Sequence, residues 1–278
     1  MDKLIGRKDE QKQVLECLES NKSELVSVYG RRRVGKTYLI KQTFNEEFDF
    51  WFTGIYEATR IQHLTQFQKA LYEKNGLKIP KIKDWFEAFD ALKNYLLSLN
   101  KEKVVVFLDE LPWMDTAKGN FLSAFSYFWN MWPSNKTLLK LYVCGSATSW
   151  MINKFVGDKG GLYGRVTCSI YLAPFNLGET EEFLREIKQI ELNRHQILEV
   201  YMILGGIPYY LDMLRKDLPL SKNIDNLFFK ENANLKTEYE FLFRSLFKNS
   251  KSYKKVVETL STKLKGLTRE EIIEATKI

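Results

Sequence analysis

One segment of the chain has the residue types and spacing needed to bind phosphate groups. Gly30–Thr37 reads G-x-x-x-x-G-K-T and lies between a short apolar run and a segment with helical periodicity. Glycines let the backbone curl so that its N–H groups surround phosphate oxygens, and the N-terminal end of the following helix favours negative charge. In this pattern Lys36 reaches the β- and γ-phosphates of a nucleotide, and the Thr37 hydroxyl ligates Mg²⁺. The expected nucleotide-binding residues of this loop are Gly30, Arg31, Arg32, Arg33, Val34, Gly35, Lys36, Thr37 and Tyr38.

A pair of carboxylates farther along the chain has the types needed for metal binding and for activating water. Asp109 and Glu110 directly follow the continuous apolar run 104–108. We expect Asp109 to hold Mg²⁺ together with Thr37, and Glu110 to act as the general base that polarises an attacking water. An Asp-Glu pair after a strand is often only a polar turn, but here it lies downstream of a phosphate-binding loop. Together, the two clusters predict that the chain binds ATP or ADP with Mg²⁺ and hydrolyses ATP.

The elements that must position these residues are those of an α/β fold. Apolar and β-branched runs predict strands over 25–30, 48–53, 104–108, 138–144 and 169–172, and helical periodicity covers 8–20, 36–43, 60–98 with a break near 76–80, and 119–130. Strands that alternate with helices favour a parallel sheet flanked by helices. A strand between the two clusters, with a glutamate after the aspartate, is typical of the additional-strand, catalytic-glutamate class of P-loop NTPases. No Asn-Lys-x-Asp motif for reading guanine is present, which argues against a GTPase.

The pattern changes after Pro174, and this change predicts the domain organisation. Residues 178–245 have helical periodicity and no convincing strand. Near the end, Thr268 and Glu271 form a Thr-x-x-Glu capping-box signature before a short apolar helix. Because that helix has only begun when the sequence stops, we expect the chain to be a piece of a longer protein. The three expected parts are an ATPase core at 1–175, a helical lid domain at 176–245, and a linker with the start of a further domain at 246–278.

Composition and charge restrict the class of protein. The chain is 45% hydrophobic and 28% charged, which excludes a disordered chain. It has no apolar run of about 18 residues that would predict a transmembrane helix, so no membrane partner is expected. It has no signal-peptide pattern, and its three separate cysteines favour a reducing, cytoplasmic location.

The net charge is +7, and residues 246–278 carry eight Lys or Arg against four Asp or Glu. This basic segment could bind DNA, or it could be a solvated lysine-rich surface.

These segments together resemble a known family, the archaeal and bacterial AAA-type ATPases related to the STAND signalling NTPases and, more distantly, to the origin-recognition ATPases. The resemblance covers essentially the whole chain, and its most specific parts are the arginine-rich phosphate loop and a Gly-Gly-Ile-Pro segment. The segments that carry it are Ile5–Glu10, Val28–Thr37, Phe107–Glu110, Cys144–Ser146, Tyr163–Arg165 and Gly205–Pro208. The resemblance implies an AAA-type core and a helical lid. A winged-helix domain and a nuclease-like domain would follow, and only the start of the winged helix would fall within this chain.

The resemblance also implies roles for residues outside the two clusters. Ile5 and Arg7 belong to an N-terminal box that lies against adenine, with a plain loop before the first helix as the alternative. Ser146 stands at the sensor position after the fourth strand, where it would bond the γ-phosphate or the water, and Thr148 is a rival for that role. Arg165 resembles an arginine finger, acting within the chain or on a neighbouring subunit, with a surface cap as the alternative.

Two features of the resemblance leave their alternatives open. Pro208 corresponds to the proline that packs on adenine in STAND proteins, since a rigid ring without an N–H suits an apolar contact, but a helix-breaking turn explains it equally well. The side chains of Arg31, Arg32 and Arg33 could face the nucleotide, a partner subunit or DNA, and a solvated basic loop is the plain alternative.

Three functions agree with these residues. The first is an ATPase switch, in which ATP binding and hydrolysis move the helical domain against the core. The second is an ATP-dependent DNA-binding module of the initiator type, and the third is an interaction protein that holds ADP with little turnover; a homo-oligomer is compatible with each. The complete set of Lys36, Thr37, Asp109 and Glu110 favours the first.

Overall fold

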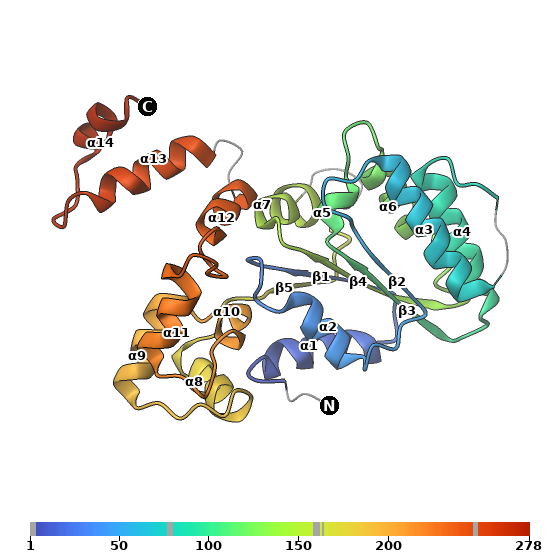
Figure 1. Ribbon diagram of the computed structural model, residues 1–278. Coiled ribbons are helices and arrows are strands. Elements are labelled where there is room, and N and C mark those ends of the chain that lie inside the picture. Colours follow the sequence, from blue (N-terminus) through green and yellow to red (C-terminus); the bar gives the residue numbers. More distant parts are fainter. Residues whose placement is uncertain (1–3, 77–79, 158–161, 163, 247–249) are drawn as a thin grey trace. The chain divides into compact units, whose positions relative to one another are not determined.

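The computed structural model describes residues 4–76, 80–157, 162, 164–246 and 250–278 (Figure 1). The chain divides into two compact units, Met1–Asp212 and Met213–Ile278, called unit 1 and unit 2 below. The two units are defined by contacts between residues, whereas the boundaries expected after 175 and after 245 rest on changes of secondary structure. Those two boundaries therefore stay predictions.

Five strands form one sheet in the described part of unit 1, and every pairing in it is parallel. The strands are β1 (Glu24–Tyr29), β2 (Phe50–Thr53), β3 (Lys103–Asp109), β4 (Leu138–Gly145) and β5 (Cys168–Tyr171). Their order in the sheet is β2-β3-β4-β1-β5. The predicted α/β class with a parallel sheet is therefore confirmed. Since β1 and β3 flank β4, the residues that follow β1 and β3 meet at the same edge of the sheet.

Helices cover both faces of this sheet. Figure 1 shows α1 (Lys8–Glu19) and α2 (Lys36–Thr43) on one face, and α3 (Arg60–Asn75), α4 (Trp85–Ser98) and α6 (Phe121–Asn130) on the other. Short helical turns follow β3 and β4, namely α5 (Leu111–Met114), α7 (Thr148–Trp150) and the π-helical η1 (Met151–Val156). The unit ends with α8 (Leu177–Glu186), α9 (Arg194–Leu204) and α10 (Pro208–Asp212).

The side chains of β3 divide between the two faces. Val104, Val106 and Leu108 are fully buried in the large core on the face of α3, α4 and α6. Phe107 packs on the other face against Phe48, with 5.4 Å between the ring centroids. A strand that is buried on both faces needs a continuous apolar run rather than an alternating one, as this segment has. The carboxylates that follow β3 therefore start from a backbone fixed by both core layers.

The helical segment expected over 60–98 is two helices. Gly76 adopts φ 68° and caps α3, a left-handed position that favours glycine. α4 begins after Asp84, whose carboxylate accepts the N–H of Glu87 at 2.9 Å. The predicted break is confirmed at Gly76, and 77–79 lie outside the described residues.

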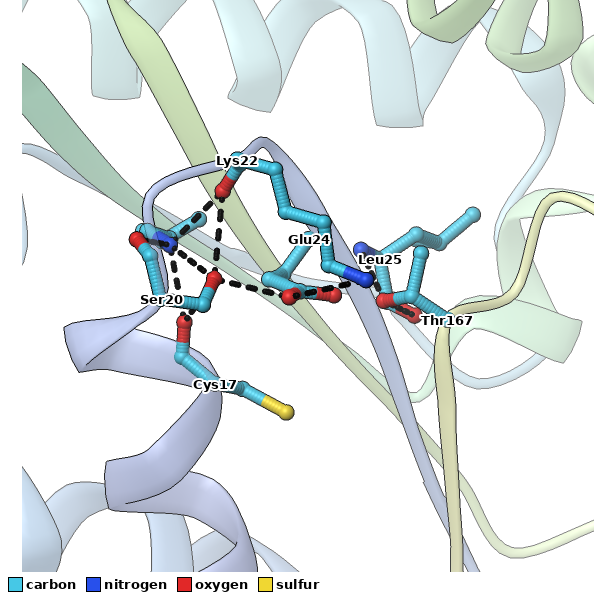
Figure 2. Close-up of polar contacts among 7 residues, drawn as sticks. Cys17, Ser20, Lys22, Glu24, Leu25 and Thr167 are labelled. Atoms are coloured by element: carbon cyan, nitrogen blue, oxygen red, sulfur yellow. Dashed lines mark hydrogen bonds and ion pairs between the residues drawn. The ribbon is translucent and has the colours of Figure 1, made fainter.

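A fully buried lysine fixes the C-terminal end of α1 to the sheet. Lys140 of β4 donates to the backbone carbonyls of Cys17 at 2.8 Å and of Ser20 and Lys22 at 2.7 Å. Figure 2 shows Cys17, Ser20 and Lys22 beside Glu24, the first residue of β1, which accepts the Ser20 hydroxyl at 2.7 Å. Burial lowers the pKa of Lys140, and the Glu24 carboxylate favours its charged form. Carbonyls at a helix C-terminus attract a cation, so the lysine ties α1, β1 and β4 together.

The described part of unit 2 is helical. Its elements are α11 (Leu220–Ile224), the π-helical η2 (Asp225–Phe229), α12 (Glu238–Leu246), α13 (Ser250–Ser261) and α14 (Arg269–Thr276). The predicted capping box is present at the start of α14, because Thr268 and Glu271 each accept the other's backbone N–H through their side chains. Across the described ranges of the chain, none of the helices combines the length and the apolar character that crossing a bilayer would require.

Candidate active site

The loop between β1 and α2 has a backbone that its glycines permit. Gly30 has φ 152°, and a Cβ at this position would lie 2.3 Å from the carbonyl oxygen of Leu172, so only glycine fits. Gly35 has φ 92° and directly precedes Lys36, the first residue of α2. Arg33 is also left-handed, with φ 71°. These three positive φ values curl the loop at the N-terminal end of α2, where backbone N–H groups favour an anion.

Lys36 lies inside this loop. Its side chain is buried, and its ammonium group donates to the carbonyls of Gly30 at 3.1 Å and Arg31 at 3.0 Å. Burial lowers the pKa of Lys36, whereas the carboxylates of Glu110 and Asp109 favour its charged form. Phosphate oxygens are stronger acceptors than neutral carbonyls, so the ammonium can exchange these bonds for bonds to phosphate.

A hydrogen bond between Thr37 and Asp109 joins the two sequence clusters. Thr37 Oγ1 donates to Asp109 Oδ2 at 2.7 Å. Burial raises the pKa of Asp109, and the bond from Thr37 lowers it. Hydroxyl and carboxylate oxygens suit Mg²⁺, which takes its remaining ligands from water and substrate phosphates. The Thr37 hydroxyl and the Asp109 carboxylate therefore fit Mg²⁺ that binds together with a nucleotide. Among the described residues there is no group of three or more His, Cys, Asp or Glu that could hold a metal ion.

Ser146, which directly follows β4, holds Glu110 in one orientation. Ser146 donates its backbone N–H at 3.1 Å and its hydroxyl at 2.7 Å to Glu110 Oε2. The backbone of Glu110 is left-handed, with φ 46°, a strained conformation for a residue other than glycine. Such strain persists where the surroundings over-determine the position, and functional sites are where it gathers.

Lys36, Thr37 and Glu110 line one cavity of about 480 Å³ in unit 1. The wall of this cavity also includes several apolar side chains. These apolar side chains are Leu4, Ile5, Phe175, Phe183, Ile187 and Pro208. A cavity of this size, lined both by a cation of the phosphate loop and by apolar groups, suits a nucleotide, whose phosphates need the first and whose base needs the second.

Arg7 lines the same cavity, but its guanidinium group is engaged with the protein. It is buried, it donates to the carbonyls of Ala173 at 2.6 Å and Val34 at 3.3 Å, and it lies over the ring of Phe175 at 4.8 Å. Burial lowers the pKa of Arg7, and Glu10 favours its charged form. Arg7 therefore joins the phosphate loop to the segment after β5.

The Gly-Gly-Ile-Pro segment forms a tight corner before α10. Gly205 caps α9 with φ 67°. Gly206 has φ 65°, and a Cβ there would lie 2.1 Å from the carbonyl oxygen of Phe175. The N–H of Phe175 donates to the carbonyl of Gly206 at 2.8 Å. This close backbone pairing places Pro208, the first residue of α10, in the cavity wall.

Comparison with known proteins agrees with this geometry. A family model described as an ATPase domain predominantly from Archaea matches residues 4–214. The chain belongs to this family. An uncharacterized protein of Methanocaldococcus jannaschii is 30% identical over 257 residues, which cover 92% of this chain and 54% of the relative. The chain thus spans about half the length of the curated relative that it matches.

Solved structures show the fold that this ATPase family member shares with other proteins. The Walker-type ATPase PABY2304 of Pyrococcus abyssi matches with a TM-score of 0.63 and 18% identity, over 99% of this chain and 89% of that one. The ORC2 protein of Aeropyrum pernix matches with TM-scores of 0.51 in its ADPNP–ADP complexes and 0.50 in its ADP form, both at 15% identity. The two matches cover 99% and 100% of this chain, and 68% and 70% of the ORC2 chains. The expected likeness to origin-recognition ATPases therefore holds for the fold.

Several predicted site residues of this family member do not line the cavity. Arg165 is exposed on the segment before β5, and it is absent from the described cavity wall, as are Arg31 and Arg32. Thr148, the rival sensor residue, begins α7. Tyr163, which carries part of the family resemblance, lies outside the described residues.

Sequence reasoning missed several residues of the cavity wall. Phe183 and Ile187 are one helical turn apart at the end of α8, and Tyr209 extends the wall at α10. The spacing of Phe183 and Ile187 is a signal of an apolar helix face that the sequence does contain. The spacing does not predict that this helix face lines the same cavity as the phosphate loop.

Proposed function

We propose that this chain binds ATP with Mg²⁺ and hydrolyses it to ADP and phosphate. One observation carries the proposal: the 2.7 Å hydrogen bond between Thr37 and Asp109, which brings two oxygen ligands for Mg²⁺ together from separate elements. Lys36 and Glu110 line the cavity beside them. Membership of an ATPase family supports the same activity.

The side chains divide the chemistry among them. Lys36 bonds β- and γ-phosphate oxygens and stabilises the charge that develops on them during transfer. Thr37 and Asp109 would hold Mg²⁺, which supplies further positive charge to the phosphates. Glu110 accepts the proton of the attacking water, and Ser146 keeps its carboxylate oriented. The contacts of Ser146 support this orienting task in place of a direct bond to the γ-phosphate.

The hydrolysis is proposed to drive a conformational switch, as the resemblance to STAND NTPases implies. A nucleotide in this cavity would touch the phosphate loop, and it would also touch Phe183 of α8 and Pro208 of α10. It would therefore link the sheet to the helices that follow it. Loss of the γ-phosphate would weaken that link and change the position of these helices.

Two substitutions separate binding from hydrolysis. We expect Lys36→Ala to abolish ATP binding in calorimetry, because the loop loses its buried cation. We expect Glu110→Gln to bind ATP within about threefold of the wild-type affinity while turnover falls by about 10²–10⁴. Lys12→Ala, at an exposed position on α1, serves as the control for charge removal.

The outcomes distinguish the candidate functions. Unchanged turnover in Glu110→Gln would remove the assigned base. Wild-type protein that gives no heat with any adenine nucleotide would refute nucleotide binding altogether. ADP that co-purifies with the protein, together with negligible turnover, would favour the function of an ADP-holding interaction protein over that of an ATPase.

DNA binding is the second candidate function, and unit 2 carries the observation that favours it. Lys251 and Lys255 are exposed on α13, and α13 with α14 would form the opening of a winged-helix domain. Binding of duplex DNA at low ionic strength that weakens steeply with salt would support this function, and its absence would exclude it for this chain.

Arg165 is exposed, and it is therefore the candidate for acting on a neighbouring copy of the chain. ATP-dependent oligomerisation, measured by size-exclusion chromatography, would test this role.

A further inference from the structure

Arg33 links the phosphate loop to α10. Its guanidinium carbon lies 4.4 Å from the centroid of the Tyr209 ring and 5.6 Å from that of Tyr210. The shorter distance is that of a cation–π contact, which corresponds to about two- to thirtyfold in an equilibrium constant. Arg33 and Tyr209 both line the cavity that contains Lys36 and Thr37. The contact therefore belongs to the wall of the proposed nucleotide site.

Both ends of this contact start from a fixed backbone. On the loop, Arg33 is held in the left-handed region with φ 71°. On α10, Tyr209 follows the corner in which Gly206 pairs with the backbone of Phe175, and Ile207 in that corner is fully buried. The tyrosine thus follows a backbone-paired, buried corner, and the long arginine side chain has more rotatable bonds with which to adjust to it.

The charges nearby favour an anion at this wall. Lys36 already places one cation in the loop, and Arg33 adds a guanidinium from the same loop. Two acids are among the described wall residues: Glu110, whose carboxylate accepts two bonds from Ser146, and Asp212 of α10, whose carboxylate pairs with Lys188 at 3.0 Å. Because Asp212 is paired with Lys188, its charge at this wall is compensated.

We propose that Tyr209 is a positioning residue for Arg33, holding its guanidinium beside the phosphates as a second cation next to Lys36. The inference rests on the proposed function, since it concerns the same nucleotide. Stacking uses the face of the guanidinium, whereas bonds to phosphate use the N–H groups at its edge, so that one side chain can make both contacts. A lysine would keep the charge but lose the planar stack.

Nucleotides of different charge distinguish positioning from a merely structural role. A second cation acts on phosphate charge, so its loss should weaken ATP more than ADP, and AMP least. A wall residue that only shapes the cavity would change the affinity for all three by the same factor. Calorimetric titration of ATP, ADP and AMP into the full chain at constant ionic strength measures this dependence.

The test compares four variants that all keep the backbone of the loop. We expect Tyr209→Leu and Arg33→Lys each to weaken ATP binding by about five- to tenfold, and AMP binding by less than about twofold. The double variant should be no weaker than the worse single variant, because both changes break the same contact. Tyr209→Phe keeps the aromatic face and should recover most of the affinity lost in Tyr209→Leu.

The contrary results are equally specific. Three results would each overturn the inference: equal loss of ATP and AMP affinity in Tyr209→Leu, losses that multiply in the double variant, or no recovery of affinity in Tyr209→Phe. In each case ATP binding by the wild-type chain would leave the proposed function intact. A wild-type chain that binds no adenine nucleotide would instead refute the proposed function, and this inference with it. Circular dichroism verifies folding, and if Tyr209→Leu fails to fold, Arg33→Lys provides the same comparison of ATP with AMP.

Discussion

Asp109 shows two opposing demands on a single residue. To bind a cation its carboxylate must be ionised, yet it ends a strand buried on both faces, and only 4% of the residue is exposed. The hydroxyl of Thr37 and the N–H of Glu110 donate to its two oxygens at 2.7 and 2.9 Å and offset part of the desolvation. The pKa nevertheless lies above its ordinary value, so desolvation outweighs these bonds. Without a cation, the ionised carboxylate therefore destabilises the fold.

This balance predicts that Asp109→Asn stabilises the nucleotide-free protein. The raised pKa means that the folded state binds a proton more readily, so wild-type stability falls as pH rises from the ordinary value near 3.8 through the folded-state pKa. At pH 7 we expect the variant to gain about 0.5–2 kcal/mol in the free energy of unfolding. The gain should shrink as pH falls through the same window, where the wild-type carboxyl becomes neutral.

Urea denaturation at pH 7 and at pH 4, without nucleotide or Mg²⁺, measures this gain. Asp90→Asn on the exposed side of α4 is the control, and its effect should stay within about 0.5 kcal/mol. A midpoint for Asp109→Asn below that of the wild type at pH 7 would show that the ionised carboxylate does not destabilise the fold.

At the scale of elements, the corner between α9 and α10 decides where the apolar wall of the cavity lies. Two glycines with nearly the same φ stand next to each other in it, 67° at Gly205 and 65° at Gly206. A Cβ on Gly205 would meet nothing within 4 Å, whereas one on Gly206 would collide with the backbone of Phe175. The second glycine is therefore required by the close approach, and the first only by its conformation.

The pair predicts two different costs for the same substitution. Gly205→Ala should lower the free energy of unfolding by about 1–2 kcal/mol, the strain of alanine in the left-handed region. Gly206→Ala should add about 1–3 kcal/mol for the collision, and it should also weaken ATP binding because Pro208 and Tyr209 shift with α10. Chemical denaturation and calorimetry of the two variants provide the comparison. Equal effects on stability would contradict the assigned backbone contact.

At the scale of the whole molecule, the proposed site belongs to one unit. The described residues that line the cavity run from Leu4 to Asp212, all within unit 1, and the family match covers 4–214. No residue of unit 2 is among those described lining residues. The proposed nucleotide site and the basic helix α13 therefore belong to different units of the chain.

We accordingly predict that residues 1–214 expressed alone bind ATP within about threefold of the full chain's affinity. The physical reason is that unit 1 has its own core and supplies every described residue of the cavity wall. Isothermal titration of the fragment and the full chain measures this, with Lys36→Ala in the fragment as the control for specific binding. A folded fragment that does not bind ATP would show that unit 2 contributes to the site.

The sequence predicted the parts of the site that are contiguous in the chain. The phosphate loop and the carboxylates of β3 are recognisable because their chemistry depends on neighbouring residues and on the strand or helix next to them. The strands followed in the same way, since a buried parallel strand leaves a continuous apolar run, as 104–108 does. Arg7 was placed near the site, but its engagement with the carbonyls of Val34 and Ala173 was not predictable.

By itself, the sequence determined the α/β class, a phosphate loop at Gly30–Thr37, and a pair of carboxylates after a buried strand. Only the tertiary structure decided that Ser146 holds Glu110 and that Tyr209 stacks on Arg33. The physical reason is distance along the chain. Periodicity and motif spacing report interactions between near neighbours, whereas these contacts depend on the order of strands in the sheet and on how a glycine corner sets the following helix against the loop.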